Sequence, residues 1–422
     1  MRQLIAITLA LFLSMVILRA DAKTYFCATT GDDSYAGTIL KPWKTLQRIS
    51  SQTLNPGDTV YIRAGTYNSG SSTDSPQNSW LIDGKNGNAS NWITITIYPA
   101  DLANGGRVVF NCGDYSHTDD HVGIYIQNSS YLKIKGIRVT GIPQKKAGQV
   151  CIGWFLVTNN DIALENCEAD HIGNTGFRHH NTTNATFLNC DAHHIDNPYD
   201  DGIQQHGGSD GFGRYDVSNT SQNTLYKNCR AWFCSDDGWD LNNSNGTVTF
   251  NGCWSFWNGY VQDIFPLTHT QAGVNWGDGN GFKLAGDQST GASAVTRIVV
   301  NCVAFENFYN GFDQNMGQFK GEFYHNTVYN CGNIAYAFYT KPGDIGHILK
   351  NNVAYRVKKT TNAFGSAVQS NNSWQIAELA DSDFRSINSK GADGARQADG
   401  SMPQLLFLKP KSASKIAGIG AR

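Results

Sequence analysis

The sequence predicts an all-β fold, a right-handed parallel β-helix solenoid with an N-terminal helical cap. Three observations support this prediction. A cysteine or asparagine recurs at one position of a repeat, and a short apolar alternation precedes most recurrences. The composition combines 44 glycines with only 10 prolines. Abundant glycine with little proline is typical of many short strands and tight turns, and it argues against a disordered linker.

The repeat is a short motif with one characteristic slot, first filled by cysteine and later by asparagine. The slot falls at Cys167, Cys190, Cys229, Cys253, Cys302, Asn326 and Asn352. Most successive slots lie about two dozen residues apart, and self-similarity at such a period predicts a solenoid. The two wider gaps leave room for an insertion or a further, degenerate coil.

Short strands are predicted immediately before the slots. Apolar and polar residues alternate over 161–164, 185–188, 247–250 and 297–300. Such alternation indicates strands of three to five residues, and no helical period fits between them. A β-propeller is the main structural rival, but its blades usually need about 40 residues. In stacked coils like positions lie about 4.8 Å apart, so side chains form ladders. We therefore expect the ten cysteines to be mostly free, buried thiols, with one or two bridges left open.

The two ends of the chain differ from the repeat. Residues 1–22 combine a basic start, an apolar run over 4–18 and a small-x-small pattern, which predicts a signal peptide. We therefore expect a secreted, extracellular protein with no membrane anchor, formed by a single β-helix domain over 23–422. Helical spacing over 42–49 predicts a cap, which extends over about 23–67 and covers the open end of the solenoid. The repeat is lost from about residue 366, so a tail should pack along the outside or over the C-terminal end.

The net charge of the chain limits the kinds of partner that it can bind. The formal net charge is -2, which is close to neutral. Nucleic-acid binding through a basic field is therefore disfavoured, because such binding depends on many phosphate contacts by Lys and Arg. An anionic substrate would need a local positive feature, such as a metal ion.

Acidic residues gather at one flank of the predicted solenoid, after the slot. They occur in the segments 209–213, 235–240, 277–284 and 311–315. Coil stacking should place Asp210 beside Asp236 and Asp237, where neighbouring carboxylates raise each other's pKa. A calcium ion resolves this repulsion, because it prefers several carboxylate oxygens at about 2.3–2.6 Å. Together with Asp240 these residues predict a Ca²⁺ site, and the alternative is a solvated acidic turn.

Lys283 stands out because it lies between Phe282 and Leu284 in a strand-like segment. A lysine in such a place is commonly a solvated strand position. Beside a bound dication its ammonium form would be disfavoured, so its pKa should fall. A neutral lysine is a competent general base.

Four segments, read in order, resemble the family 9 polysaccharide lyases, chiefly pectate lyases. They are Asp-Gly-Phe-Gly from 210, Ser-Asp-Asp-Gly-Trp-Asp-Leu from 235, Gly-Asn-Gly-Phe-Lys-Leu from 279 and Gly-Phe-Asp-Gln-Asn from 311. The likeness also covers the opening at 56–67 and the tail at 398–403. Two departures are Ala285-Gly286, where the family often has two glycines, and the long segment 261–276 before the lysine.

The resemblance implies a function and assigns roles position by position. The calcium ligands of the family match Asp210, Asp236, Asp237 and Asp240, and its catalytic base matches Lys283. The implied activity is calcium-dependent β-elimination in polygalacturonate, an acidic plant cell-wall polysaccharide, which yields 4,5-unsaturated oligogalacturonides. No organic cofactor is needed, and we expect a monomer.

Three rival functions remain open from sequence. A glycoside hydrolase could use Asp236 and Asp237 as its two carboxylates. A lyase of this fold could act on alginate or a glycosaminoglycan, and a non-catalytic β-helix could simply bind carbohydrate. Further candidates with a structural alternative are His179, His180, His193 and His194 as metal ligands, Arg178 and Arg214 as substrate contacts, and Trp239, Trp254 and Trp257 as sugar platforms.

Overall fold

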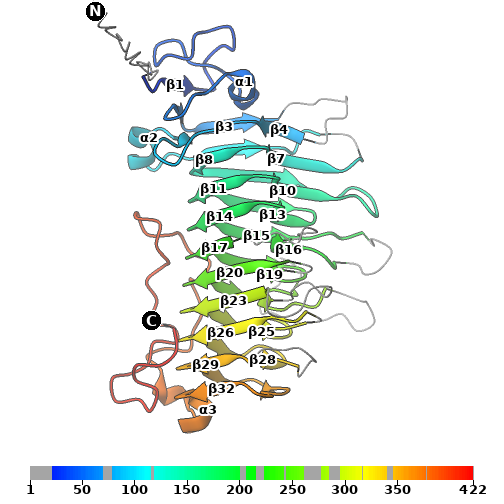
Figure 1. Ribbon diagram of the computed structural model, residues 1–422, viewed down its shortest axis with the longest axis vertical. Coiled ribbons are helices and arrows are strands. Elements are labelled where there is room, and N and C mark those ends of the chain that lie inside the picture. The colour runs from blue at the N-terminus through cyan, green and yellow to red at the C-terminus, as the bar shows by residue number, and fades with distance from the viewer. Residues whose placement is uncertain are drawn as a thin grey trace, which may run out of the picture.

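The computed structural model describes residues 21–69, 78–115, 118–199, 206–214, 223–241, 244–260, 277–284, 295–315, 317–339, 346–376 and 378–421. Within these residues the chain forms an elongated stack of coils, and its last segment returns along one side of the stack (Figure 1). Each full coil adds one strand to each of three parallel sheets, which we name A, B and C. The predicted parallel β-helix is therefore confirmed.

Sheet A has twelve strands among the described residues. They are β1 (Thr24–Cys27), β2 (Thr59–Ile62), β5 (Ile93–Ile97), β8 (Ser130–Lys135), β11 (Asn160–Glu165), β14 (Thr183–Leu188), β17 (Asn223–Lys227), β20 (Gly246–Asn251), β23 (Val295–Val300), β26 (Lys320–Tyr324), β29 (Ile348–Lys350) and β32 (Val368–Ser370).

Sheets B and C each have ten strands among the described residues. Sheet B contains β3 (Gly65–Asn68), β6 (Val108–Asn111), β9 (Ile137–Ile142), β12 (Glu168–Ile172), β15 (Asp191–Ile195), β18 (Arg230–Cys234), β21 (Trp254–Phe256), β24 (Val303–Phe305), β27 (Thr327–Tyr329) and β30 (Val353–Tyr355). Sheet C contains β4 (Asn78–Asp83), β7 (His121–Gln127), β10 (Cys151–Val157), β13 (Thr175–His180), β16 (Asp210–Arg214), β19 (Trp239–Asp240), β22 (Phe282–Lys283), β25 (Phe312–Asp313), β28 (Ile334–Ala337) and β31 (Lys359–Thr361).

The repeated slot forms a buried ladder at the turn from sheet A to sheet B. Asparagine often precedes the slot because that residue adopts a left-handed conformation, with φ of 52° at Asn166 and 55° at Asn189. All ten cysteines are free and buried, as predicted. Asn326 continues the ladder, and its Nδ2 donates to Oδ1 of Asn352 at 3.1 Å. An amide suits this place because it can both donate and accept between coils.

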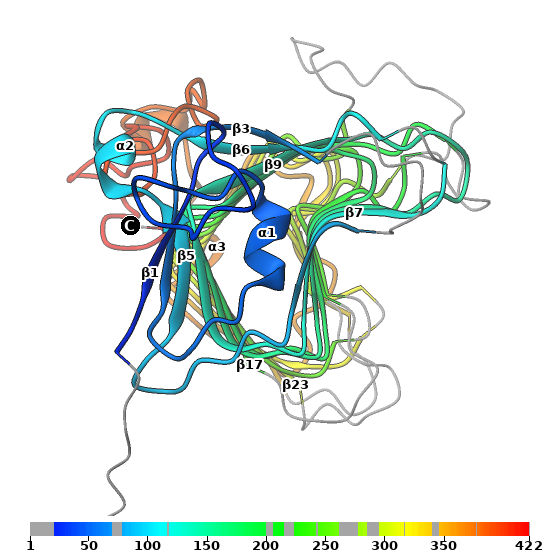
Figure 2. The ribbon, with the colours of Figure 1, turned by 90° about the horizontal axis from the view of Figure 1, so that it is seen from above.

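The N-terminal end carries a short helix, α1 (Leu46–Ser51), which Figure 2 shows across the end of the coil stack. Leu46 and Ile49 are buried, and the buried ring of Trp43 stacks on Tyr25 at 5.0 Å. The helix is shorter than the predicted 42–49, since Thr45 is already its extended N-cap. A second short helix, α2 (Pro99–Ala103), follows β5. A capping role for residues 23–67 stays a prediction.

The C-terminal segment packs on the outer face of sheet B. After β32 come α3 (Ser373–Ile376) and the 3-10 helix η2 (Asp381–Asp383). Phe384, Phe407 and Ile416 are buried in one cluster with side chains of sheet B such as Phe305 and Tyr329. The coils continue to Ser370, a few residues beyond the predicted start of the tail. Among the described residues, no helix is long and apolar enough to cross a membrane.

Candidate active site

In the strands of sheet C that carry the site, an aromatic residue faces the core and the residue after it faces outward. Phe212, Trp239, Phe282 and Phe312 point inward and stack at ring distances of 4.7 to 4.8 Å from coil to coil. Their neighbours therefore point outward. The register pairs Asp240 with Lys283, and Lys283 with Asp313. Adjacent coils thus bring residues that are far apart in sequence into one outward row.

A second row of polar residues lies two positions before the inward aromatic residues, each directly before a glycine. It contains Asp210, Asp237, Asn280 and Asn310. The glycines are required because sheets B and C come close together here. A Cβ placed on Gly238 would lie 2.0 Å from Oγ of Ser255 and 2.7 Å from the carbonyl oxygen of Gly281. The Asp-Gly pairs of the sequence therefore reflect packing between two sheets as well as turn geometry.

Hydrogen bonds along this row fix one oxygen of each aspartate. Asp210 Oδ1 accepts from the backbone N–H of Asp237 at 3.3 Å, and Asp237 Oδ1 accepts from the backbone and side-chain nitrogens of Asn280 at 2.7 and 3.0 Å. The second oxygen of Asp210 is buried without a hydrogen bond. A buried carboxylate oxygen that lacks a donor is unfavourable, and it points to a ligand that supplies positive charge.

Two loops hold Asp236 beside this row. Its Oδ2 accepts from the backbone N–H of Gly208 at 2.6 Å, and its Oδ1 accepts from that of Asp278 at 2.6 Å. Asp236 and Asp237 are both buried. The loop that brings in Asp278 thus adds a further carboxylate to the cluster.

Lys283 lies at the centre of the carboxylates. Its Nζ is 3.1 Å from Oδ2 of Asp237, 3.4 Å from Oδ2 of Asp240 and 3.4 Å from Oδ2 of Asp278. Its side chain is only 13% exposed, which excludes the alternative of a solvated strand lysine. The structure therefore brings all five predicted site residues together.

The crowding of charges shifts the pKa values of the cluster. Burial, and then the charges of Asp240 and Asp236, raise the pKa of Asp210 well above its usual range. Burial and Asp236 do the same for Asp237. Burial lowers the pKa of Lys283, but the charges of Asp237 and Asp240 outweigh it and raise this pKa well above its ordinary value. The expected fall of the Lys283 pKa thus requires a dication, because the carboxylates alone have the opposite effect.

The donor set fits a hard divalent cation. Carboxylate oxygens of Asp210, Asp237 and Asp240 lie within 4.8 Å of one another, and so do those of Asp236, Asp237 and Asp278. Asp237 belongs to both groups. Oxygen-only donors in this number suit calcium, and the donorless oxygen of Asp210 agrees with such a ligand.

Two members of the cluster were missed by sequence reasoning as site residues, Asp278 and Asp313. Both stand in segments whose acidic character was noted. The repeated Gly-Phe in Gly281-Phe282 and Gly311-Phe312 could have revealed Asp313. If both phenylalanines face inward on adjacent coils, the residues that follow them, Lys283 and Asp313, must lie side by side on the outside. The predicted departures at 261–276 and 285–286 lie outside the described residues.

Four of the other candidate residues, His179, Arg214, Trp239 and His193, have structural surroundings. His179 is fully buried and its Nε2 is 3.0 Å from the hydroxyl of Tyr226. Arg214 is also fully buried and donates to the carbonyl oxygen of Asn245 at 2.7 Å. Trp239 belongs to the core stack. His193 lies with Glu168 and Asp170 in a group that could hold a metal, but the two oxygens of Asp170 already accept from the Arg138 guanidinium at 2.6 Å.

Comparison with known proteins identifies the family. A family model described as a Pel9A-like right-handed β-helix region matches residues 25–362. The chain belongs to this Pel9A-like family. Pectate lyase L of Dickeya chrysanthemi is 30% identical over 410 residues, which cover 95% of this chain and 86% of the relative. Pectate lyase PEL9 of Emericella nidulans is 24% identical, with 95% of this chain and 94% of the relative covered.

Solved structures agree with this membership. The crystal structure of pectate lyase Pel9A superposes with a TM-score of 0.73 at 25% identity, covering 94% of this chain and 91% of the other. A rhamnogalacturonan lyase superposes with a TM-score of 0.76 at 25% identity, covering 95% and 100%. Together with the curated pectate lyases, these matches show that this Pel9A-like chain is an enzyme, a polysaccharide lyase of the pectate lyase type.

Proposed function

We propose that this Pel9A-like lyase is secreted and cleaves polygalacturonate by calcium-dependent β-elimination, releasing 4,5-unsaturated oligogalacturonides. One observation carries the proposal: Lys283 Nζ lies within 3.4 Å of three carboxylates on the outer face of sheet C, beside a buried carboxylate oxygen without a donor. In this proposal Asp210, Asp236, Asp237 and Asp240 hold calcium, and Asp278 adds charge at the open side.

The roles follow from elementary chemistry. Calcium, when bound, would balance the carboxylates and stabilise the charge that develops on the uronate carboxyl group. Lys283 then removes the proton at C5, next to that carboxyl group, and the glycosidic oxygen at C4 leaves. The carboxylates hold Lys283 Nζ in one place, which restricts the orientation of the base. Two backbone N–H groups already fix the oxygens of Asp236, so this carboxylate would be in place before calcium binds.

The test is the ultraviolet absorbance of the unsaturated product during digestion of polygalacturonate. We expect absorbance to rise, to stop with a calcium chelator and to return with added calcium. Replacing Lys283 by Ala should lower kcat by about 10²–10⁴-fold, the range of general base catalysis. The matched control is Lys359→Ala, at an exposed lysine of β31 in the same sheet. Cleavage without absorbance would instead indicate a hydrolase, and a rise indifferent to chelator would remove calcium from the proposal.

A second substrate is favoured by one specific observation, the superposition with a rhamnogalacturonan lyase over the whole of that chain. Both polymers would present a uronate whose C5 proton lies next to a carboxyl group, so Lys283 would serve either. The same absorbance assay on a rhamnogalacturonan backbone decides between them. Greater kcat/KM on that backbone than on polygalacturonate would make it the substrate, without changing the roles of the site residues.

A further inference from the structure

The outward row that contains Asp240 and Lys283 continues far beyond the catalytic residues. Toward the N-terminal end, the register pairs Asp240 with Gly213, Gly213 with Arg178, and Arg178 with Phe155. Phe155 in turn pairs with Tyr125, and Tyr125 with Leu81. The order along sheet C is therefore Leu81, Tyr125, Phe155, Arg178, Gly213, Asp240, Lys283 and Asp313.

These side chains lie on the outside because their neighbours fill the core. Trp80, Ile124, Trp154 and Phe177 are fully buried, so the residue after each faces outward. Leu81 is 37% exposed, and Tyr125, Phe155 and Arg178 are partly exposed. Loops that join sheet B to sheet C project beyond this face near β7 (Figure 2).

The chemical character of the row changes at the site. On its C-terminal side Lys283 is followed by Asp313, and Asp278 lies close by. On its N-terminal side come a glycine without a side chain, a guanidinium and two aromatic rings. A polyanion is repelled by the first side and attracted by the second, because its carboxylates favour arginine. The aromatic rings offer apolar surface to the C–H groups of sugar rings.

Arg178 is held in a defined orientation by its neighbours. Its Nε donates to Nε2 of His180 at 3.2 Å, and its guanidinium carbon lies 5.8 Å from the ring centre of Phe155. Burial, and then the charge of Arg178, lower the pKa of His180 to about 4, so this imidazole is a neutral acceptor near pH 7. The rings of Phe155 and Tyr125 stack at 5.3 Å, and His180 meets Phe155 edge-on at 5.0 Å. A side chain already ordered in this way loses little entropy when it binds a carboxylate.

We propose that Arg178, Phe155 and Tyr125 form a distal subsite, which binds uronate residues of the polymer on the N-terminal side of Lys283. The proposal rests on the proposed lyase activity on polygalacturonate. At about 4.8 Å per strand, Arg178 lies ~14 Å and Tyr125 ~24 Å from Lys283 along the sheet. The subsite therefore acts on long substrates and is out of reach of the shortest ones.

The test compares kinetics on polygalacturonate and on short oligogalacturonides of defined length. For Arg178→Ala and for Tyr125→Ala/Phe155→Ala we expect KM on the polymer to rise about 10-fold or more, as for interface anchors, with kcat little changed. Kinetics on a trimer should stay at the wild-type value. The conservative variants Arg178→Lys and Phe155→Leu should lie between these extremes, and thermal unfolding of each variant reports whether the fold is kept.

The matched control is Tyr309→Ala/Tyr339→Ala, because these tyrosines are 43% and 38% exposed and come from segments that adjoin the acidic side. If KM on the polymer rose only in this variant and not in Tyr125→Ala/Phe155→Ala, the polymer would bind on the C-terminal side of Lys283 instead. Wild-type KM at every length in the Arg178 and Tyr125/Phe155 variants would remove the subsite while leaving the lyase activity intact. Failure of the unaltered enzyme to release unsaturated product from any galacturonate would instead refute the proposed function.

Discussion

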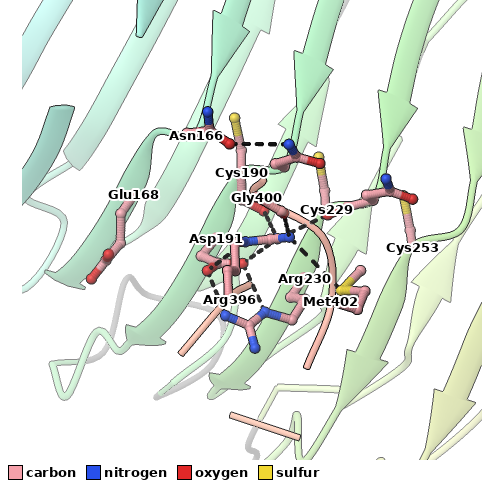
Figure 3. Close-up of polar contacts among 12 residues, drawn as sticks. Asn166, Glu168, Cys190, Asp191, Cys229, Arg230, Cys253, Arg396, Gly400 and Met402 are labelled. Atoms are coloured by element: carbon pink, nitrogen blue, oxygen red, sulfur yellow. Dashed lines mark hydrogen bonds and ion pairs between the residues drawn. The ribbon is translucent and has the colours of Figure 1, made fainter. Parts of the chain in front are cut away.

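Besides its apolar contacts, the tail is joined to the solenoid by one buried carboxylate, Asp191, which lies between two arginines (Figure 3). Arg230 on the next coil donates Nε and Nη2 to Asp191 at 2.9 and 2.7 Å. Arg396 of the tail donates Nη2 and Nε to the same carboxylate at 2.6 and 3.0 Å. Arg230 also donates to the carbonyl oxygens of Ala392 and Gly394 at 2.8 Å. Replacing Asp191 by Asn would leave two buried guanidinium groups without their counter-charge.

The size of this effect follows from the pKa of Asp191. Burial raises it, but the charges of Arg396 and Arg230 outweigh burial and lower it to about 2. The ordinary value is about 3.9 in the unfolded chain, so the shift of roughly two units corresponds to about 2.7 kcal/mol. Because the pKa is lowered in the folded state, this stability is fully present above pH 4 and is lost as the pH falls toward 2. The Asn variant should lack this acid-dependent component.

Hydrogen exchange of the tail amides over 392–402 measures the part of this contribution that is lost when the tail detaches, because Arg230 on the neighbouring coil still pairs with Asp191 after local opening. A solenoid unfolds in parts, so local opening reports better than a global midpoint. The full ~2.7 kcal/mol corresponds to roughly 100-fold, so we expect exchange in Asp191→Asn at pH 7 to be faster by up to about 100-fold. The control is Asp393→Asn, at an exposed aspartate of the same segment. Equal exchange rates in the two variants would refute the reasoning, and so would wild-type tail exchange that shows no added opening between pH 4 and pH 2.

Three further predictions concern the site and the core. Asp237→Asn should keep the hydrogen bonds from Asn280, so without calcium its free energy of unfolding should be no lower than that of wild type. Calcium at 100 times its Kd would raise the free energy of unfolding of wild type by ~2.7 kcal/mol, and the variant should lack this increase. Gly238→Ala should destabilise the protein by about 3 kcal/mol or more in urea unfolding, because the added Cβ meets Ser255 Oγ at 2.0 Å; a wild-type midpoint would contradict this packing. A thiol-specific reagent should titrate almost none of the ten cysteines before denaturation and ten afterwards, since all are buried and burial raises the pKa of Cys112 to about 12.

The coils could be predicted from the sequence only where a cysteine or asparagine fills the slot. Cys167 and Cys190 revealed their coils, and the acidic segments of the following coils then fell on one flank. One coil earlier the slot is Ile137, preceded by Gly136, which has the same left-handed conformation as Asn166. Nothing in that pair signals a coil. The register of β7 and β10, and so the outward row of Tyr125 and Phe155, could therefore not be derived from the motif.

Other features depend on contacts that no local pattern records. Arg396 reaches Asp191 across 205 positions of sequence, outside any repeat, so the tail's placement on sheet B was one of two alternatives. Asp278 follows a long segment of sequence that matches no repeat, so its position relative to Lys283 could not be derived from the motif. Lys283 itself was a candidate from its sequence context, but only the structure shows how many carboxylates surround its Nζ. That number decides the direction of its pKa shift.

The site can be understood as a change of chemistry within a structural ladder. Asn280 links the coils on either side of it. Its Oδ1 accepts from the backbone N–H of Asn310 on the next coil, and its Nδ2 donates to Asp237 on the previous one. An aspartate can only accept when ionised, so each carboxylate in the row has one oxygen more than the ladder can satisfy. Two consecutive aspartates, Asp210 and Asp237, therefore concentrate unsatisfied negative charge at one level of the stack. The rigid coils above and below prevent these oxygens from moving apart, so the repulsion is relieved either by a bound proton, as the raised pKa values of Asp210 and Asp237 show, or by a cation. On this reasoning the proposed affinity for calcium would arise from the solenoid's fixed strand spacing as much as from the acidic residues themselves.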